Sequence, residues 1–113
     1  MRDLTLYFRA LSDRKRLLIV RYLARHEEIT VSDLGKELHL SQPLISWHLR
    51  LLRRAGIVKT RRAGRQVWCS LDRGTLSTYE QRLDRLLGLD QRLPEDDGER
   101  LGSSLESATR SRN

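Results

Sequence analysis

The segment 41–54, SQPLISWHLRLLRR, combines amide, hydroxyl and guanidinium side chains with a regular apolar repeat. Its apolar residues follow at i, i+4 and i+7, which is one face of a helix. They are Ile45, Leu49 and Leu52. Gln42, Ser46 and Arg50 are left to point away from that face, and side chains of these types hydrogen-bond to base edges in the major groove of DNA. The segment therefore predicts a helix with one buried side and one side that binds a nucleic acid.

A second short helix is predicted directly before this one, over residues 30–38 (TVSDLGKEL), with Thr30 as its N-cap. The break between the two helices is residues 39–40. Ser41 is a favourable N-cap for the second helix, and Pro43 lies in its first turn, where proline is tolerated. Two short helices joined this tightly are the helix-turn-helix pattern of DNA-binding proteins.

Basic residues are concentrated between residues 50 and 65, where seven of them occur without an acidic residue, in a chain whose net charge is +7. This density favours a phosphate-bearing partner, and a solvated basic face is the alternative. Arg61, Arg62 and Arg65 flank a short turn at Ala63-Gly64-Arg65. From there we expect them to donate charge to the phosphate backbone.

The remaining elements complete a mainly α fold with a small β-hairpin wing. Helices are predicted over residues 3–11, from 14 to about 25, 30–38, 41–55 and 73–88, and strands over 57–62 and 66–71. Residues 26–29 are read as a connector. The order α-α-α-α-β-β-α is a winged helix-turn-helix with an added helix at each end. We expect residues 1–90 to form this DNA-binding and dimerisation domain and residues 91–113, which lose periodicity, to be a disordered tail.

Length and composition exclude several classes of protein. The 113 residues bound the chain to one domain with a modest core, since 38% of them are hydrophobic. One cysteine excludes an intramolecular disulfide and fits a reducing cytosol. There is no signal peptide, no membrane span and no catalytic constellation in the sequence. We therefore expect a soluble, intracellular protein that is not an enzyme.

Three segments resemble the ArsR (ArsR/SmtB) family of bacterial transcriptional regulators. They are LSDRKRLLIVRYL (11–23), SDLGKELHLSQPLISWHLRLLRRAGIV (32–58) and RRAGRQVWCSLD (61–72). The resemblance implies a cytoplasmic, nucleoid-associated bacterial protein, and a homodimer whose first and last helices form most of the interface. It also implies binding to an imperfect inverted repeat near a promoter, usually as a repressor released by an inducer; activation stays open.

The chain departs from this family at its sensing positions and in the recognition helix. Thr30 and Ser32 stand where the family's soft-metal site has two cysteines, and hydroxyls are poor ligands for soft metals. Helix 73–88 contains no histidine, so the family's zinc site across the dimer is not expected. Trp47 stands where family members commonly have arginine. It could pack on a thymine methyl or on the sugar backbone, donate one indole hydrogen bond, or pack on a neighbouring helix.

No cofactor is evident from these residues. A weak nickel-type site is the alternative left open, with His26, Glu27 and Glu28 as its candidates. Cys69 lies in an apolar strand between Val67 and Leu71, so we expect a buried, unreactive thiol.

The sequence thus predicts two contact surfaces. The expected DNA contacts are Ser41, Gln42, Ser46, Trp47, His48, Arg50, Arg61, Arg62 and Arg65. The expected dimer contacts are Leu4, Leu6, Leu76, Tyr79, Leu83 and Leu86. The predicted partners are double-stranded DNA and a second copy of the chain. The alternatives are a winged-helix module that binds protein or RNA, and a nickel-responsive regulator that acts as an activator.

Overall fold

The structure is a computed structural model that describes residues 2–89. Its elements are α1 (Arg2–Leu11), α2 (Arg14–Ala24), β1 (Ile29–Thr30), α3 (Val31–Leu38), α4 (Gln42–Arg54), β2 (Val58–Ala63), β3 (Gln66–Leu71) and α5 (Arg73–Leu86). The predicted mainly helical fold with a β-hairpin wing is confirmed. The predicted tail, residues 91–113, lies outside the described residues.

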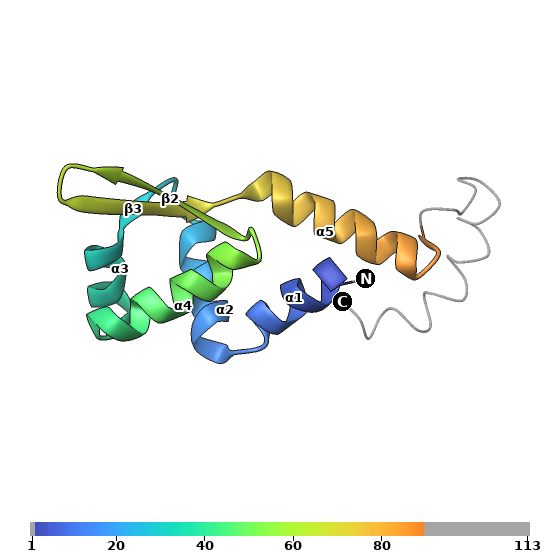
Figure 1. The fold of residues 1–113 in the computed structure, drawn as a ribbon, viewed down its shortest axis with the longest axis horizontal. Coiled ribbons are helices and arrows are strands. Elements are labelled where there is room, and N and C mark those ends of the chain that lie inside the picture. The colour runs from blue at the N-terminus through green and yellow to red at the C-terminus, as the bar shows by residue number, and fades with distance from the viewer. Residues whose placement is uncertain (1, 90–113) are drawn as a thin grey trace. The chain divides into compact units, whose positions relative to one another are not determined.

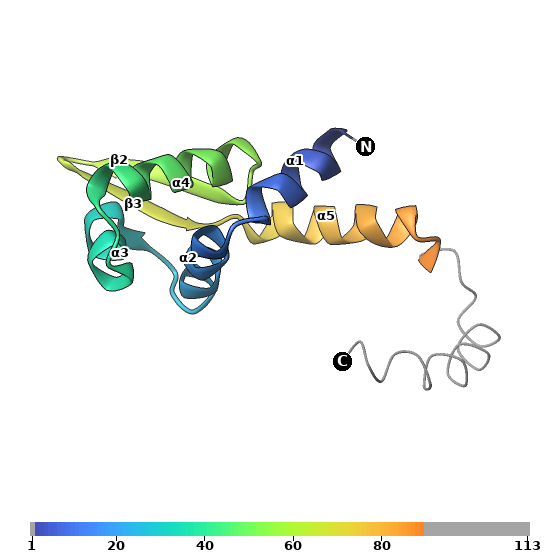
Figure 2. The same cartoon turned by 90° about the horizontal axis from the view of Figure 1, so that it is seen from below.

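The chain divides into two units, Met1–Glu80 and Gln81–Asn113, so the boundary falls within α5. The first unit holds the helix-turn-helix and the wing. Figures 1 and 2 show the hairpin of β2 and β3 lying along α4, while α3 meets the beginning of α4.

One element was not predicted. Residues 26–29 were expected to be a connector, but Ile29 and Thr30 form β1, which pairs antiparallel with β3. The sheet therefore has three strands in the order β1-β3-β2. The prediction of a connector over residues 26–29 was therefore wrong at Ile29. Two residues are too few to show the period-two alternation by which strands are recognised.

The core of the first unit gathers side chains from α2, α3, α4, β2 and β3, and from the residue that directly precedes β2. The fully buried ones are Ile19, Leu23, Leu34, Ile45, Leu52, Ile57, Val58 and Cys69. Burying one aliphatic side chain of this size contributes about 1.5–3 kcal/mol. The core holds α4 against α2, α3 and the sheet, and thereby fixes which face of α4 reaches the surface.

The boundaries of α3 and α4 follow from side-chain caps. The Thr30 hydroxyl accepts a hydrogen bond from the Asp33 amide at 3.1 Å, and the Ser41 hydroxyl accepts one from the Leu44 amide at 3.4 Å. Both predicted N-caps are confirmed. Gly56 follows α4 with a φ of 78°, as expected of a glycine after a helix. His39 ends α3 in the left-handed region with a φ of 57°.

Candidate nucleic-acid interface

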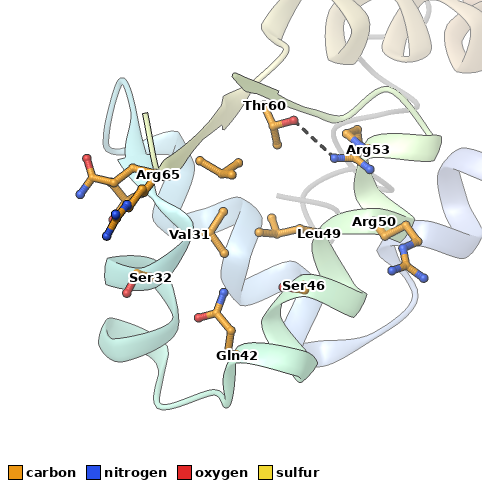
Figure 3. Close-up of a pocket in the computed structure, with 12 residues that line it drawn as sticks. Val31, Ser32, Gln42, Ser46, Leu49, Arg50, Arg53, Thr60 and Arg65 are labelled. Carbon is orange, nitrogen blue, oxygen red and sulfur yellow. Dashed lines mark hydrogen bonds between the residues drawn. The ribbon is translucent and has the colours of Figure 1, made fainter. Parts of the chain in front are cut away.

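A groove of about 320 Å³ lies between α3, α4 and the hairpin. Figure 3 shows Val31 and Leu49 facing each other across it, with Gln42 at the end where α4 begins. At the other end, Arg53 Nη1 donates a hydrogen bond to Thr60 Oγ1 at 3.4 Å. The groove thus has an apolar floor and a rim of amide, hydroxyl and guanidinium groups.

The exposed side of α4 has two rows of residues. Gln42, Ser46 and Arg53 border the groove, and so does Arg50, which also belongs to the second row. The second row, here called the outer row, is spaced at i, i+4, i+7 and i+11, which places its members on one side of a helix. The outer row is Pro43, Trp47, Arg50 and Arg54, all of them exposed.

Trp47 and Arg50 are neighbours in the outer row. The Arg50 guanidinium carbon lies 5.9 Å from the centre of the Trp47 ring, and Arg50 is turned away from α3 in Figure 3. Trp47 is 47% exposed, so it does not pack on a neighbouring helix within the described residues. That alternative for Trp47 is therefore not supported.

The wing presents two exposed arginines near its turn. Residues 64 and 65 form the turn between Ala63 and Gln66, and Gly64 has a φ of 64°, which favours glycine. Arg62 and Arg65 are exposed, and Arg65 borders the groove.

Arg61 lies in a different environment from the other two arginines of the wing. Its Nε and Nη2 donate hydrogen bonds to the two carboxylate oxygens of Glu28 at 2.6 and 2.8 Å. Its guanidinium carbon also lies 5.5 Å from the centre of the Trp68 ring. The hydrogen bonds from Arg61 hold the pKa of Glu28 below its usual value. The positive charge of Arg61 is thus already matched within the protein.

His48 is buried rather than presented to DNA. It is 5% exposed, and Arg16 Nη1 donates a hydrogen bond to its Nδ1 at 3.1 Å. Asp13 Oδ2 lies 4.0 Å from the same nitrogen. Burial, with a contribution from Arg16, lowers the pKa of His48. The prediction of His48 as a DNA contact is therefore corrected: position 48 faces α2 because the helical repeat places it beside Ile45 and Leu52.

The candidate nickel ligands are not brought together. His26 donates from Nδ1 to the Tyr22 carbonyl at 2.7 Å and stacks on the Tyr22 ring. Both carboxylate oxygens of Glu28 are taken by Arg61. Over residues 2–89, no three His, Cys, Asp or Glu side chains form a group that could hold a metal ion.

Cys69 is fully buried, and its thiol donates a hydrogen bond to the Ile29 carbonyl at 3.3 Å. Burial raises the pKa of this thiol to about 11. The predicted burial of Cys69 is confirmed, and a raised pKa favours the thiol over the reactive thiolate. Its partner Ile29 belongs to the unpredicted strand β1.

The predicted dimer contacts of the first unit divide into buried and exposed residues. Leu4 is 6% exposed in the single chain and leaves little surface for a partner. Leu6 is 40% exposed, and the unpredicted Phe8 is 44% exposed. Tyr79 is half-buried, with its ring stacked on Tyr7 at 4.2 Å and its hydroxyl donating to the Ala55 carbonyl at 3.2 Å.

Three further predicted dimer contacts lie on α5. Leu76 is half-buried in the first unit, packed against its core. Leu83 and Leu86 belong to the second unit, where Leu83 is half-buried and Leu86 is 52% exposed. Dimerisation through these residues stays a prediction.

Sequence reasoning missed part of the groove. Ser32, Thr60 and Gln66 line it together with the α4 residues, although they come from α3, β2 and β3. Arg53 could have been found, because it lies at i+7 from Ser46 and therefore on the same side of the helix. The residues of the hairpin could not, since strand pairing decides which of them face α4.

The sequence is similar to those of known bacterial transcriptional regulators. The sequence profile of the bacterial regulatory proteins of the arsR family matches residues 13–60. The chain is 40% identical over 81 residues to a "Transcriptional repressor SmtB homolog" of Synechocystis sp., covering 71% of this chain and 61% of that protein. It is 36% identical to the HTH-type transcriptional regulator YceK of Bacillus subtilis over 64% of this chain and 73% of the relative.

The fold also resembles that of solved ArsR-like regulators. An ArsR-like transcriptional regulator from Rhodococcus sp. RHA1 superimposes with a TM-score of 0.70 at 27% identity, over 94% of this chain and 92% of the other. The chain thus spans about three-fifths of the cyanobacterial relative and most of the Rhodococcus structure. None of the helices within residues 2–89 is long and apolar enough to cross a membrane.

Proposed function

The chain belongs to the arsR family of bacterial regulatory proteins, and from that premise we propose that it is a homodimeric repressor that binds an inverted-repeat operator. Members of this family are DNA-binding transcriptional regulators rather than enzymes. Repression fits the name of the cyanobacterial relative, which is a repressor homologue.

The observation that carries the proposal is the exposed side of α4 beside the wing. A helix that enters the major groove contacts base edges with side chains near its beginning. Gln42 and Ser46 are exposed there and Arg50 is exposed further along α4, and their amide, hydroxyl and guanidinium groups suit base edges. Arg62 and Arg65 on the wing supply charge for the phosphate backbone. We therefore assign recognition to α4 and orientation to the wing.

The proposal is tested with the full chain and DNA of defined sequence. A binding duplex is first isolated by in vitro selection from random duplexes. Its affinity is then measured by fluorescence anisotropy against a duplex of the same composition in shuffled order. We expect the selected duplex to bind much more tightly, because base contacts add to the phosphate contacts that both duplexes offer.

The variant Arg50→Ala tests the assignment of α4. We expect a loss of about 1–3 kcal/mol at the selected duplex, with little change for the shuffled duplex. Arg21→Ala removes an equally exposed arginine from α2 and serves as the control. An unchanged affinity of Arg50→Ala for the selected duplex would contradict the assignment. Equal affinity for selected and shuffled duplexes would contradict sequence-specific binding altogether.

A further inference from the structure

We infer that Trp47 makes the recognition helix α4 select thymine, by packing its indole on the 5-methyl group of that base. This inference rests on the proposed function, since it requires α4 to enter the major groove. It names one base preference and one residue that produces it.

The first support is where Trp47 lies among the exposed apolar residues. Over residues 2–89, the large hydrophobic side chains that are exposed are Leu6, Phe8, Leu17, Trp47, Leu86 and Leu87. Trp47 alone of these belongs to α3, α4 or the hairpin. It lies in the first half of α4, in the outer row, on the side away from the buried Ile45 and Leu52. A side chain in this position contacts any partner that binds the exposed side of α4.

The second support is the charge around the indole. Its neighbours in the outer row at i+3 and i+7 are Arg50 and Arg54, and the Arg50 guanidinium carbon lies 5.9 Å from the ring centre. No second large apolar side chain of α4 is exposed, since Leu44 and Leu51 are half-buried, so a hydrophobic protein interface would have only a small patch there. An apolar ring with two arginines on one side of it suits a polyanion that carries isolated apolar groups.

Double-stranded DNA has such a group in the major groove. Thymine presents its 5-methyl there, and apolar side chains contact it. Tryptophan has no positive charge to offer a phosphate, and its one N–H is a donor only. Contact with the methyl is therefore the interaction that uses most of the exposed indole. It distinguishes thymine from cytosine and from uracil, both of which lack the methyl.

The experiment removes the methyl alone. In the duplex obtained by in vitro selection, each thymine is replaced in turn by uracil, which leaves every hydrogen-bonding group of the base pair in place. For the wild-type chain we expect one position in each half-site at which uracil weakens binding about threefold to fivefold, from the loss of one buried methyl. The other thymines should tolerate the change.

The variant Trp47→Ala then assigns the effect to its residue. It should bind the thymine duplex more weakly, and it should no longer distinguish thymine from uracil at the sensitive position. Trp47→Phe, which keeps an aromatic ring, should retain part of the discrimination. Leu17→Ala truncates an exposed apolar side chain on α2, which is 50% exposed, and should keep both affinity and discrimination. Circular dichroism confirms that each variant is folded.

Three results would overturn the inference while leaving the proposed function intact. The first is a selected duplex at which no thymine is sensitive to uracil. The second is a Trp47→Ala variant that keeps the wild-type ratio of affinities for thymine and uracil. The third is a Trp47→Ala variant that weakens selected and shuffled duplexes equally, which is the signature of a sugar-backbone contact. Failure to select any duplex would overturn the proposed function together with this inference.

Discussion

His48 shows how a single side chain inside the helix-turn-helix is held by charge. Its Nδ1 accepts a hydrogen bond from Arg16, whose Nε also donates to the Ala10 carbonyl at 2.6 Å. Arg16 thereby links the end of α1 to the middle of α4. Since Nδ1 is the acceptor, the imidazole is neutral with its proton on Nε2, and this buried nitrogen has no hydrogen-bond partner among the described residues. Protonating the ring would place a second positive charge beside Arg16.

We predict that acidification from pH 7.5 to 5.5 lowers the free energy of unfolding through His48. The folded-state pKa of His48 is below its ordinary value of about 6.5, because burial and the nearby Arg16 and Lys15 outweigh the favourable Asp13. The unfolded chain therefore binds more protons as the pH falls through 6.5, at a slope of at most about 1.4 kcal/mol per pH unit for one proton. Urea unfolding at several pH values measures this slope.

His48→Gln is the matched variant, since its amide oxygen still accepts a hydrogen bond from Arg16. We expect it to lack the His48 part of the slope in this pH range. The carboxylates of Asp13, Glu28 and Asp72 have lowered pKa values, so their titration falls at more acidic pH. Parallel stability curves for wild type and variant between pH 7.5 and 5.5 would show that His48 does not carry the effect.

At the scale of residues, sequence patterns predict which side of a helix a residue lies on better than they predict its hydrogen-bond partner. The exposed positions of Gln42, Ser46 and Arg50 follow from the helical repeat of Ile45 and Leu49. The same repeat places His48 on the buried side of the helix. It does not reveal that His48 hydrogen-bonds to Arg16, because the two residues are 32 positions apart in the chain. Hydrogen bonds over such separations depend on how helices pack, and no local pattern encodes them.

At the scale of elements, the wing has one arginine that is paired with a carboxylate and two others nearer its turn. The Glu28–Arg61 pair joins the segment before β1 to β2 across the sheet. Arg62 and Arg65 lie nearer the turn and are exposed. An arginine that neutralises a phosphate releases a counterion, whereas one already matched by a carboxylate offers less net charge.

We predict that Arg65→Ala weakens binding to selected and shuffled duplexes alike. The slope of log K against log salt should fall by about 1, as expected for one lost phosphate contact. The double variant Glu28→Gln, Arg61→Gln leaves the net charge unchanged and should leave the slope unchanged. Anisotropy titrations at four salt concentrations measure both slopes. A loss confined to the selected duplex would indicate that Arg65 reads bases.

The helices and the hairpin were predictable because each has local signals at its ends. Thr30 and Ser41 cap α3 and α4, and Gly64 supplies the positive φ of the turn. β1 had no such signal. It exists because Ile29 and Thr30 lie beside Cys69 and Trp68 once the helices have packed, so it is a product of the tertiary structure.

At the scale of the whole molecule, exposed apolar side chains on α1 predict self-association. Leu6 and Phe8 are 40% and 44% exposed, and large exposed apolar groups on so small a chain favour a partner surface. We expect the full chain to be a dimer at micromolar concentration by light scattering. The double variant Leu6→Glu, Phe8→Glu should be monomeric and bind the selected duplex more weakly.

Leu17→Glu provides the control for this prediction, because Leu17 is 50% exposed on α2 rather than on α1. It should remain dimeric and keep its affinity for DNA. A monomeric wild-type chain that still binds the selected duplex tightly would contradict dimerisation as a requirement for binding.

The metal-ligating side chains available in the whole chain also limit which metal ions can release the protein from DNA. Soft metals require thiolates, and the single cysteine of the sequence is Cys69. That thiol is fully buried, with a pKa raised to about 11. At the positions of the family's cysteine pair, the Thr30 hydroxyl caps α3 and Ser32 offers a neutral hydroxyl.

We therefore predict that stoichiometric arsenite, cadmium or lead leaves the protein on the selected duplex. Calorimetry with each metal and anisotropy with DNA test this together, and tight 1:1 binding of cadmium coupled to loss of DNA affinity would prove the prediction wrong. Nickel is tested in parallel. Its candidate ligands are His26, Glu27, His39 and terminal groups, and no three metal-ligating side chains gather within residues 2–89, so we expect it to bind weakly at most.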